Sequence, residues 1–105
     1  MTQDDTIALM KQIRDIIKDT VPENMRYFVA DEWMEDIVVD LYNSNEASIA
    51  MEAFLSNLDD SKANVPKHLL EQLLAAAQPL VVGNELPEDK FEALSERLRS
   101  YSKSE

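Results

Sequence analysis

Apolar residues recur along the chain at the three- and four-residue spacing of amphipathic helices, in stretches separated by proline or by short polar segments. This pattern predicts helices over residues 4–18, 21–42, 46–58, 65–78 and 87–101. Thr2 and Asp5 form a weak capping box before the first stretch, and Pro79 should kink or end the fourth because it lacks a backbone N–H. The single glycine leaves little room for tight β-hairpins. We predict one compact all-α domain of about five short helices.

The stretch over residues 21–42 allows two interpretations. Its main apolar face consists of Ala30, Trp33, Met34, Ile37, Val38 and Leu41. A helical wheel places Phe28 and Val39 away from that face, among acidic residues. Either the helix breaks near Asp31, or Phe28 and Val39 form a second apolar surface with Met25. Packing in the core is the plainer role for these side chains, whereas an exposed apolar spot surrounded by charge is typical of an anchor for a partner protein.

Acidic residues outnumber basic ones. The 105-residue chain holds 21 Asp and Glu against 10 Lys and Arg, and its net charge is −11. A surface of this sign does not attract the phosphates of nucleic acids or of anionic lipids, so we expect neither direct nucleic-acid binding nor membrane binding. Cysteine is absent, no apolar run of about 18 residues occurs, and the acidic first residues do not resemble a secretory signal. We therefore expect a cytoplasmic location.

The acidic excess is concentrated in the second and third predicted helices. Residues 21–60 hold ten acidic residues and one basic residue, Arg26. Two stripes with four-residue spacing result on the second helix, one of Glu32, Asp36 and Asp40 and one of Asp31 and Glu35. Neighbouring carboxylates on a helix repel each other by roughly 0.2–0.5 kcal/mol per pair. The stripes therefore either serve solubility alone or bind something basic, with an attraction that weakens as salt is added.

Candidate catalytic and metal-binding chemistry is sparse. His68 is the only histidine, and its neighbours in sequence form neither a nucleophile–base pair nor a set of metal ligands. The segment that begins at Asp59 places Asn64 where a calcium loop needs glycine, and Leu70 where it needs glutamate. We therefore expect no enzymatic activity, no metal and no cofactor.

Two segments resemble part of a known group of proteins. One reads Val21-Pro22-x-x-Met25-x-x-Phe28-Val29-x-x-x-Trp33, and the other runs from Leu86-Pro87-Glu88 to Leu98. Both are similar to the C-terminal helical part of large bacterial proteins of unknown function that are sometimes labelled thymidine phosphorylases. The resemblance covers less than half of the chain, and the chain departs from those proteins in length. It implies no activity here.

These observations favour a small non-enzymatic protein that binds other proteins. We expect an inhibitor or regulator that presents an acidic helix surface to a basic protein or nucleic-acid-binding complex, as a phage-type anti-CRISPR or anti-restriction protein would, with carboxylates in place of phosphates. The candidate contact residues are Asp31, Glu32, Glu35, Asp36, Asp40, Glu46 and Glu52, with Phe28 and Val39. The alternative is a homodimeric helical scaffold or adaptor that uses an apolar helix face, formed by Phe28, Val39 or the leucines of the fourth helix.

Overall fold

The computed structural model describes residues 2–102, and every regular element within them is helical. In chain order these elements are α1 (Gln3–Ile17), the 3-10 helix η1 (Glu23–Val29), α2 (Asp31–Trp33), the π-helical η2 (Met34–Val39), α3 (Asp40–Asn43), α4 (Ala47–Asp60), α5 (Lys67–Val82) and α6 (Glu88–Tyr101). The predicted all-α class is confirmed. The expected number of five helices is wrong, because residues 2–102 contain six α-helical segments and the second expected helix is divided.

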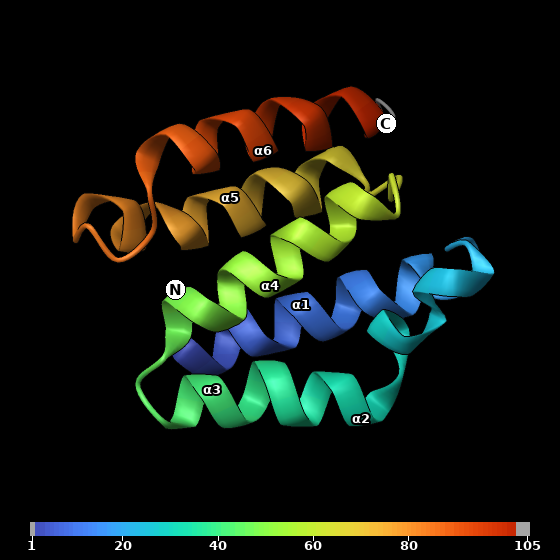
Figure 1. The fold of residues 1–105 in the computed structure, drawn as a ribbon, viewed down its shortest axis with the longest axis horizontal. Helices are drawn as coiled ribbons and strands as arrows, with labels where there is room; N and C mark the ends of the chain where they lie inside the picture. Colours follow the sequence, from blue (N-terminus) through green and yellow to red (C-terminus); the bar gives the residue numbers. More distant parts are fainter. Residues whose placement is uncertain (1, 103–105) are drawn as a thin grey trace.

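The helices form a compact bundle in which α1 and α4 occupy the middle (Figure 1). On one side of them lie α5 and α6, and on the other side α2, η2 and α3 follow one another without a break. The largest fully buried side chains line the space between these elements: Met10, Ile13, Ile17, Phe28, Met34, Met51, Phe54, Leu55, Leu58, Leu70, Leu73 and Leu86. Burial of one such side chain contributes about 1.5–3 kcal/mol, so this core provides most of the driving force for folding.

Most of the predicted helix ends lie close to the observed ones. The capping box is confirmed, because the N–H of Asp5 donates to Thr2 Oγ1 at 3.1 Å and the N–H of Thr2 donates to Asp5 Oδ2 at 3.3 Å. The expected end of a helix at residue 78 is wrong, since α5 continues through Pro79. Proline removes only one helical hydrogen bond there, and the N–H of Gly83 closes the following turn on the Pro79 carbonyl at 3.0 Å.

The helix expected over residues 21–42 is interrupted at Ala30, so the first interpretation of this segment is confirmed. Ala30 is extended, with φ −75° and ψ 148°, between η1 and α2. A 3-10 helix also has three residues per turn, so the wheel of a continuous α-helix misplaces every side chain before the break. Phe28 is fully buried, with its ring centroid 5.1 Å from that of Trp33 and 5.5 Å from that of Phe54. The expectation that Phe28 is an exposed anchor is therefore wrong.

The second apolar surface expected around Val39 is absent from the described chain. Val39 is half-buried and packs against the core, and Met25 is buried. The reason is the π-helical turn of η2. Its hydrogen bonds run from residue i to i+5, so each residue advances less around the axis than in an α-helix. Val39 is thereby brought closer to the face of Met34, five residues earlier, which lies in the core.

Candidate protein-binding surface

We call residues 31–43, which comprise α2, η2 and α3, the acidic rod. Its stripe of Asp31 and Glu35 is paired with bases of α1. Arg14 Nη1 donates to Asp31 Oδ1 at 2.7 Å, and Lys11 Nζ donates to Glu35 Oε1 at 3.4 Å. The Arg14 side chain is only 11% exposed and also donates to the carbonyl of Val29 at 3.3 Å. This stripe therefore joins the acidic rod to α1, and its charge is largely compensated within the molecule.

The other stripe of the acidic rod remains uncompensated. Glu32, Asp36 and Asp40 are exposed, and so is Glu46 in the turn before α4. Among residues 2–102, none of these four carboxylates has an ion-pair partner or a side-chain hydrogen bond. Asp36 lies in the π-helical turn, an element often found at functional sites. The structure thus divides the predicted acidic surface into a paired stripe and a free one.

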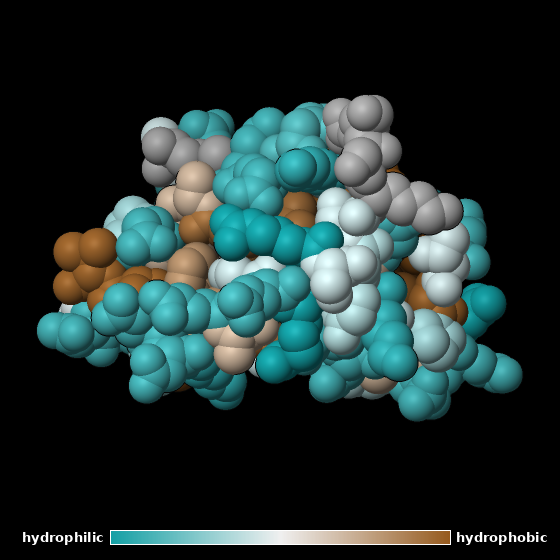
Figure 2. All heavy atoms as spheres, turned by 90° about the horizontal axis from the view of Figure 1, so that it is seen from above, coloured by the Kyte–Doolittle hydropathy of each residue, from teal (hydrophilic) through white to brown (hydrophobic). Residues whose placement is uncertain are grey.

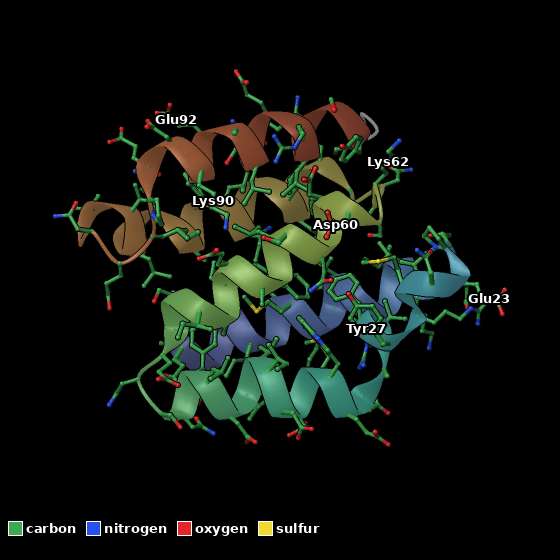
Figure 3. The ribbon with its side chains drawn as sticks, in the orientation of Figure 1. Glu23, Tyr27, Asp60, Lys62, Lys90 and Glu92 are labelled. Carbon is green, nitrogen blue, oxygen red and sulfur yellow. The ribbon has the colours of Figure 1, made fainter. Side chains whose placement is uncertain are left out.

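Glu52 does not belong to either stripe. It lies on α4 and pairs with Lys90 of α6, whose side chain reaches toward α4 (Figure 3). The contact links two helices on the side of α4 away from the acidic rod. Glu52 is therefore better explained as a link between α4 and α6 than as part of a surface shared with Asp36.

A shallow hollow of about 390 Å³ lies beside the free stripe, where η1 meets the acidic rod. We call it the aromatic hollow, and its lining residues are Tyr27, Ala30, Glu32, Trp33, Asp36 and Ile37. The extended backbone at Ala30 allows Tyr27 of η1 and Trp33 of α2 to line the same hollow. Analysis of the sequence missed this site, because a continuous helix gives no reason to group the two rings. The only available signal was the position of Trp33 between Glu32 and Asp36.

Both rings of the aromatic hollow are fixed from behind. Tyr27 is 54% exposed, and its hydroxyl donates to Asn57 Oδ1 on α4 at 2.8 Å (Figure 3). Trp33 is half-buried, and its ring lies edge-on to that of Phe28 with an interplanar angle of 86°. The same ring is tilted relative to that of Phe54, with the two ring centroids 6.4 Å apart. These contacts orient both rings toward the surface without a ligand. Two free carboxylates and two aromatic rings thus share one small surface.

On the opposite side of the molecule, formed by α5 and α6, two arginines pair with carboxylates, whereas Glu88, Glu92 and Glu96 of α6 are exposed and have no ion-pair partner among residues 2–102. Arg99 donates two hydrogen bonds to Glu71, both at 2.9 Å, and Arg97 donates to both carboxylate oxygens of Asp59 at 3.0 Å. The hydrogen bond from Arg99 holds the pKa of Glu71 below its usual value. Figure 2 shows this side as largely hydrophilic, with a patch of apolar residues at one end. Val82, the last residue of α5, is 73% exposed.

The leucines of the fourth predicted helix are not available as an interface. Leu69, Leu70, Leu73 and Leu74 are all buried in the core of the chain. The amphipathic face that suggested a dimer is used within the fold, against α1, α4 and α6. With Phe28 and Val39 also packed inward, the homodimeric alternative lacks the apolar faces that were expected to carry it.

The described residues contain few features of other function classes. Within residues 2–102, no group of three or more His, Asp or Glu side chains is placed to hold a metal ion. His68 is exposed in the first turn of α5. None of the helices in this part of the chain combines the length and the apolar character needed to cross a membrane.

Comparison with known proteins adds no assignment. The chain matches no family model, no curated protein and no solved structure. The resemblance of residues 21–33 and 86–98 to bacterial proteins labelled thymidine phosphorylases therefore stays a prediction. The functional argument rests on the acidic rod and on the aromatic hollow beside it.

Proposed function

We propose that this protein is a non-enzymatic inhibitor or regulator that binds a basic protein through the free stripe of the acidic rod. One observation carries the proposal. Glu32, Asp36 and Asp40 follow one another along a helical segment that contains no basic residue, and Lys11 and Arg14 of the neighbouring α1 are engaged by the other stripe. A cationic surface of another molecule would supply the missing partner charges.

The energetics support a role beyond folding. Carboxylates four residues apart on a helix destabilise it by roughly 0.2–0.5 kcal/mol per pair. The stripe of Glu32, Asp36 and Asp40 contains two such pairs and gains no compensating contact within residues 2–102. Binding a basic partner would remove this repulsion, and the field of the stripe would accelerate the encounter.

The spacing favours a partner that handles nucleic acids. Residues four apart rise about 6 Å along a helix, whereas phosphates on one DNA strand rise about 3.4 Å each. The stripe therefore offers roughly one carboxylate for every two phosphates, on a rigid support. A groove of Lys and Arg side chains built for phosphates could accept it, as in anti-restriction or anti-CRISPR inhibition, and we propose that the protein acts in the cytoplasm on such a complex.

Charge reversal with a matched control tests the proposal. The variant Glu32→Lys/Asp36→Lys places two bases on the free stripe. The control Glu92→Lys/Glu96→Lys makes the same change in net charge on α6, at exposed positions with the same four-residue spacing. Tagged proteins are used to capture partners from a lysate of the source cells at low and at high salt, and the captured proteins are identified by mass spectrometry.

We expect wild type and the α6 control to retain the same basic, nucleic-acid-binding protein at low salt and to release it at high salt. The free-stripe variant should lose this protein, while neither variant loses more than about 0.5 kcal/mol of stability, as is usual for surface substitutions. Equal capture by both variants would contradict the proposal, and so would capture that is insensitive to salt.

A further inference from the structure

The aromatic hollow joins two kinds of recognition chemistry, aromatic rings and carboxylates. Its lining residues include the aromatic Tyr27 and Trp33 and the acidic Glu32 and Asp36, two members of the free stripe. Its volume of about 390 Å³ falls within the roughly 300–1,000 Å³ of ordinary ligand pockets. The hollow is therefore large enough for a single long side chain, and it carries a charge of the opposite sign to a cation.

We propose that the aromatic hollow binds an arginine side chain of the basic partner, an inference that rests on the proposed function. The guanidinium would lie against the rings of Trp33 and Tyr27 and pair with Glu32 and Asp36. Guanidinium groups stack on aromatic faces and form two parallel hydrogen bonds to a carboxylate, so arginine uses both features of this site at once.

Preorganisation argues for a real site rather than an accidental depression. The Tyr27 hydroxyl is held by Asn57 Oδ1, and the Asn57 side-chain amide is itself fixed because Nδ2 donates to the carbonyl of Ala53 at 2.9 Å. Trp33 packs against the buried rings of Phe28 and Phe54. A guest would therefore meet rings that are already placed, and little side-chain freedom would be lost on binding.

Arginine fits better than the other candidates. An apolar guest would leave the carboxylates of Glu32 and Asp36 desolvated beside it without a partner, which is costly. A lysine would satisfy one charge, but its compact, strongly hydrated ammonium makes fewer simultaneous contacts with a ring and a carboxylate than the planar guanidinium does. The charge and the shape of the site together select a flat cation.

Trp33 provides a direct readout, because it is the only tryptophan in the chain. The probes are three capped hexapeptides with the pattern Gly-X-Gly-Gly-X-Gly, in which X is arginine, lysine or the uncharged citrulline. Each is titrated into the full chain while the emission of Trp33 and the NMR signal of its indole N–H are followed. We expect the arginine peptide to bind about fivefold more tightly than the lysine peptide and about tenfold more tightly than the citrulline peptide.

Variants separate the hollow from the general acidic surface. Glu32→Gln/Asp36→Asn keeps the shapes and removes both charges, and should weaken the arginine peptide by about fivefold. Tyr27→Ala removes one wall at an exposed position without changing charge and should also weaken it. Glu92→Gln/Glu96→Gln on α6 is the control and should bind as wild type does. Thermal unfolding of each variant verifies that it is folded.

Equal affinity for the three peptides, or an affinity unchanged by the hollow variants, would overturn the arginine site. The outcome for the proposed function is distinguishable. If Tyr27→Ala still captures the partner from lysate while Glu32→Lys/Asp36→Lys does not, the acidic stripe binds without the hollow. If the arginine peptide binds as expected but charge reversal leaves capture unchanged, the hollow is a cation site and the proposed function fails.

Discussion

The guanidinium of Arg14 on α1 donates to the carboxylate of Asp31 at 2.7 Å. Asp31 is the first residue of α2 and directly follows the extended Ala30. Arg14 also donates to the Val29 carbonyl, so one side chain contacts the backbone before the break and the side chain after it. The pair of Lys11 and Glu35 repeats the connection one turn later. These contacts connect the acidic rod to α1.

We predict that Arg14→Ala lowers the free energy of unfolding by about 1–2 kcal/mol, because it removes the hydrogen bond to the Val29 carbonyl and the packing of a mostly buried side-chain stem. The exposed carboxylate of Asp31 contributes little to this figure. Urea unfolding measures the change, with Lys18→Ala, an exposed cation at the end of the same helix, as the control. A loss no larger than that of the control would mean that Arg14 does not position the rod.

Two neighbouring residues before Ala30 should differ strongly in how much their side chains contribute to stability. Phe28→Ala is expected to cost about 3–5 kcal/mol, because Phe28 is fully buried between Trp33 and Phe54. Tyr27→Ala should cost less than about 1 kcal/mol, since its ring is largely exposed and it loses one surface hydrogen bond. Denaturant unfolding of the two variants tests the course of the chain through η1. A continuous α-helix with Phe28 outside would give the smaller value for Phe28.

The sequence was sufficient for the fold class, because the apolar spacing of most helices reflects their own burial. The Thr2 and Asp5 capping box could be read directly, since its chemistry is local. The path through residues 21–42 could not, because a 3-10 turn, an extended Ala30 and a π-helical turn each change the angle between successive side chains. No single periodicity describes such a segment, so the helical wheel misplaced Phe28 and Val39.

Only one part of the candidate site, the acidic residues of the free stripe, could be predicted from the sequence. The free stripe of Glu32, Asp36 and Asp40 follows from four-residue spacing within one helix. Residues four apart stay on nearly the same face in an α-helix and in a π-helix, so the stripe is retained. Which stripe is compensated depends on α1, since the bases that engage Asp31 and Glu35 are distant in sequence. The aromatic hollow depends on the extended Ala30, which allows Tyr27 and Trp33 to line one hollow. The ion pairs are tertiary contacts and the hollow results from a local change of backbone geometry, and regular helical spacing predicts neither.

Burial of Tyr42 makes the stability of the protein depend on pH in the alkaline range. Tyr42 is 6% exposed, and this burial raises the pKa of its hydroxyl from 10.0 to about 12. Between these values the unfolded chain loses the proton while the folded chain keeps it, so stability falls as the pH rises above 10. We expect Tyr42→Phe to flatten that fall, and the difference between the tyrosinate absorbance titrations of the two proteins to centre near the raised pKa. A difference centred at the ordinary value would show that Tyr42 is open to solvent.

The two stripes of the acidic rod should differ in the sign of their effect on stability. We predict that Asp36→Asn raises the free energy of unfolding by about 0.4–1 kcal/mol at low salt, because it removes the repulsion with Glu32 and with Asp40. The gain should shrink as salt screens these exposed charges. Asp31→Asn should instead lower the free energy of unfolding by about 0.2–1 kcal/mol, because this substitution removes the ion pair with Arg14.

Urea unfolding at low and high salt, combined with partner capture, gives this comparison its functional meaning. An Asp36→Asn variant that is more stable and yet binds the partner less tightly would show that the carboxylate is kept at the expense of stability, as binding sites often are. The Asp31→Asn variant should lose stability while it retains most of the capture, since its carboxylate is already engaged by Arg14. If Asp36→Asn were instead destabilising, Asp36 would have a stabilising contact of its own, and the free stripe would lose the property on which its assignment as a binding surface depends.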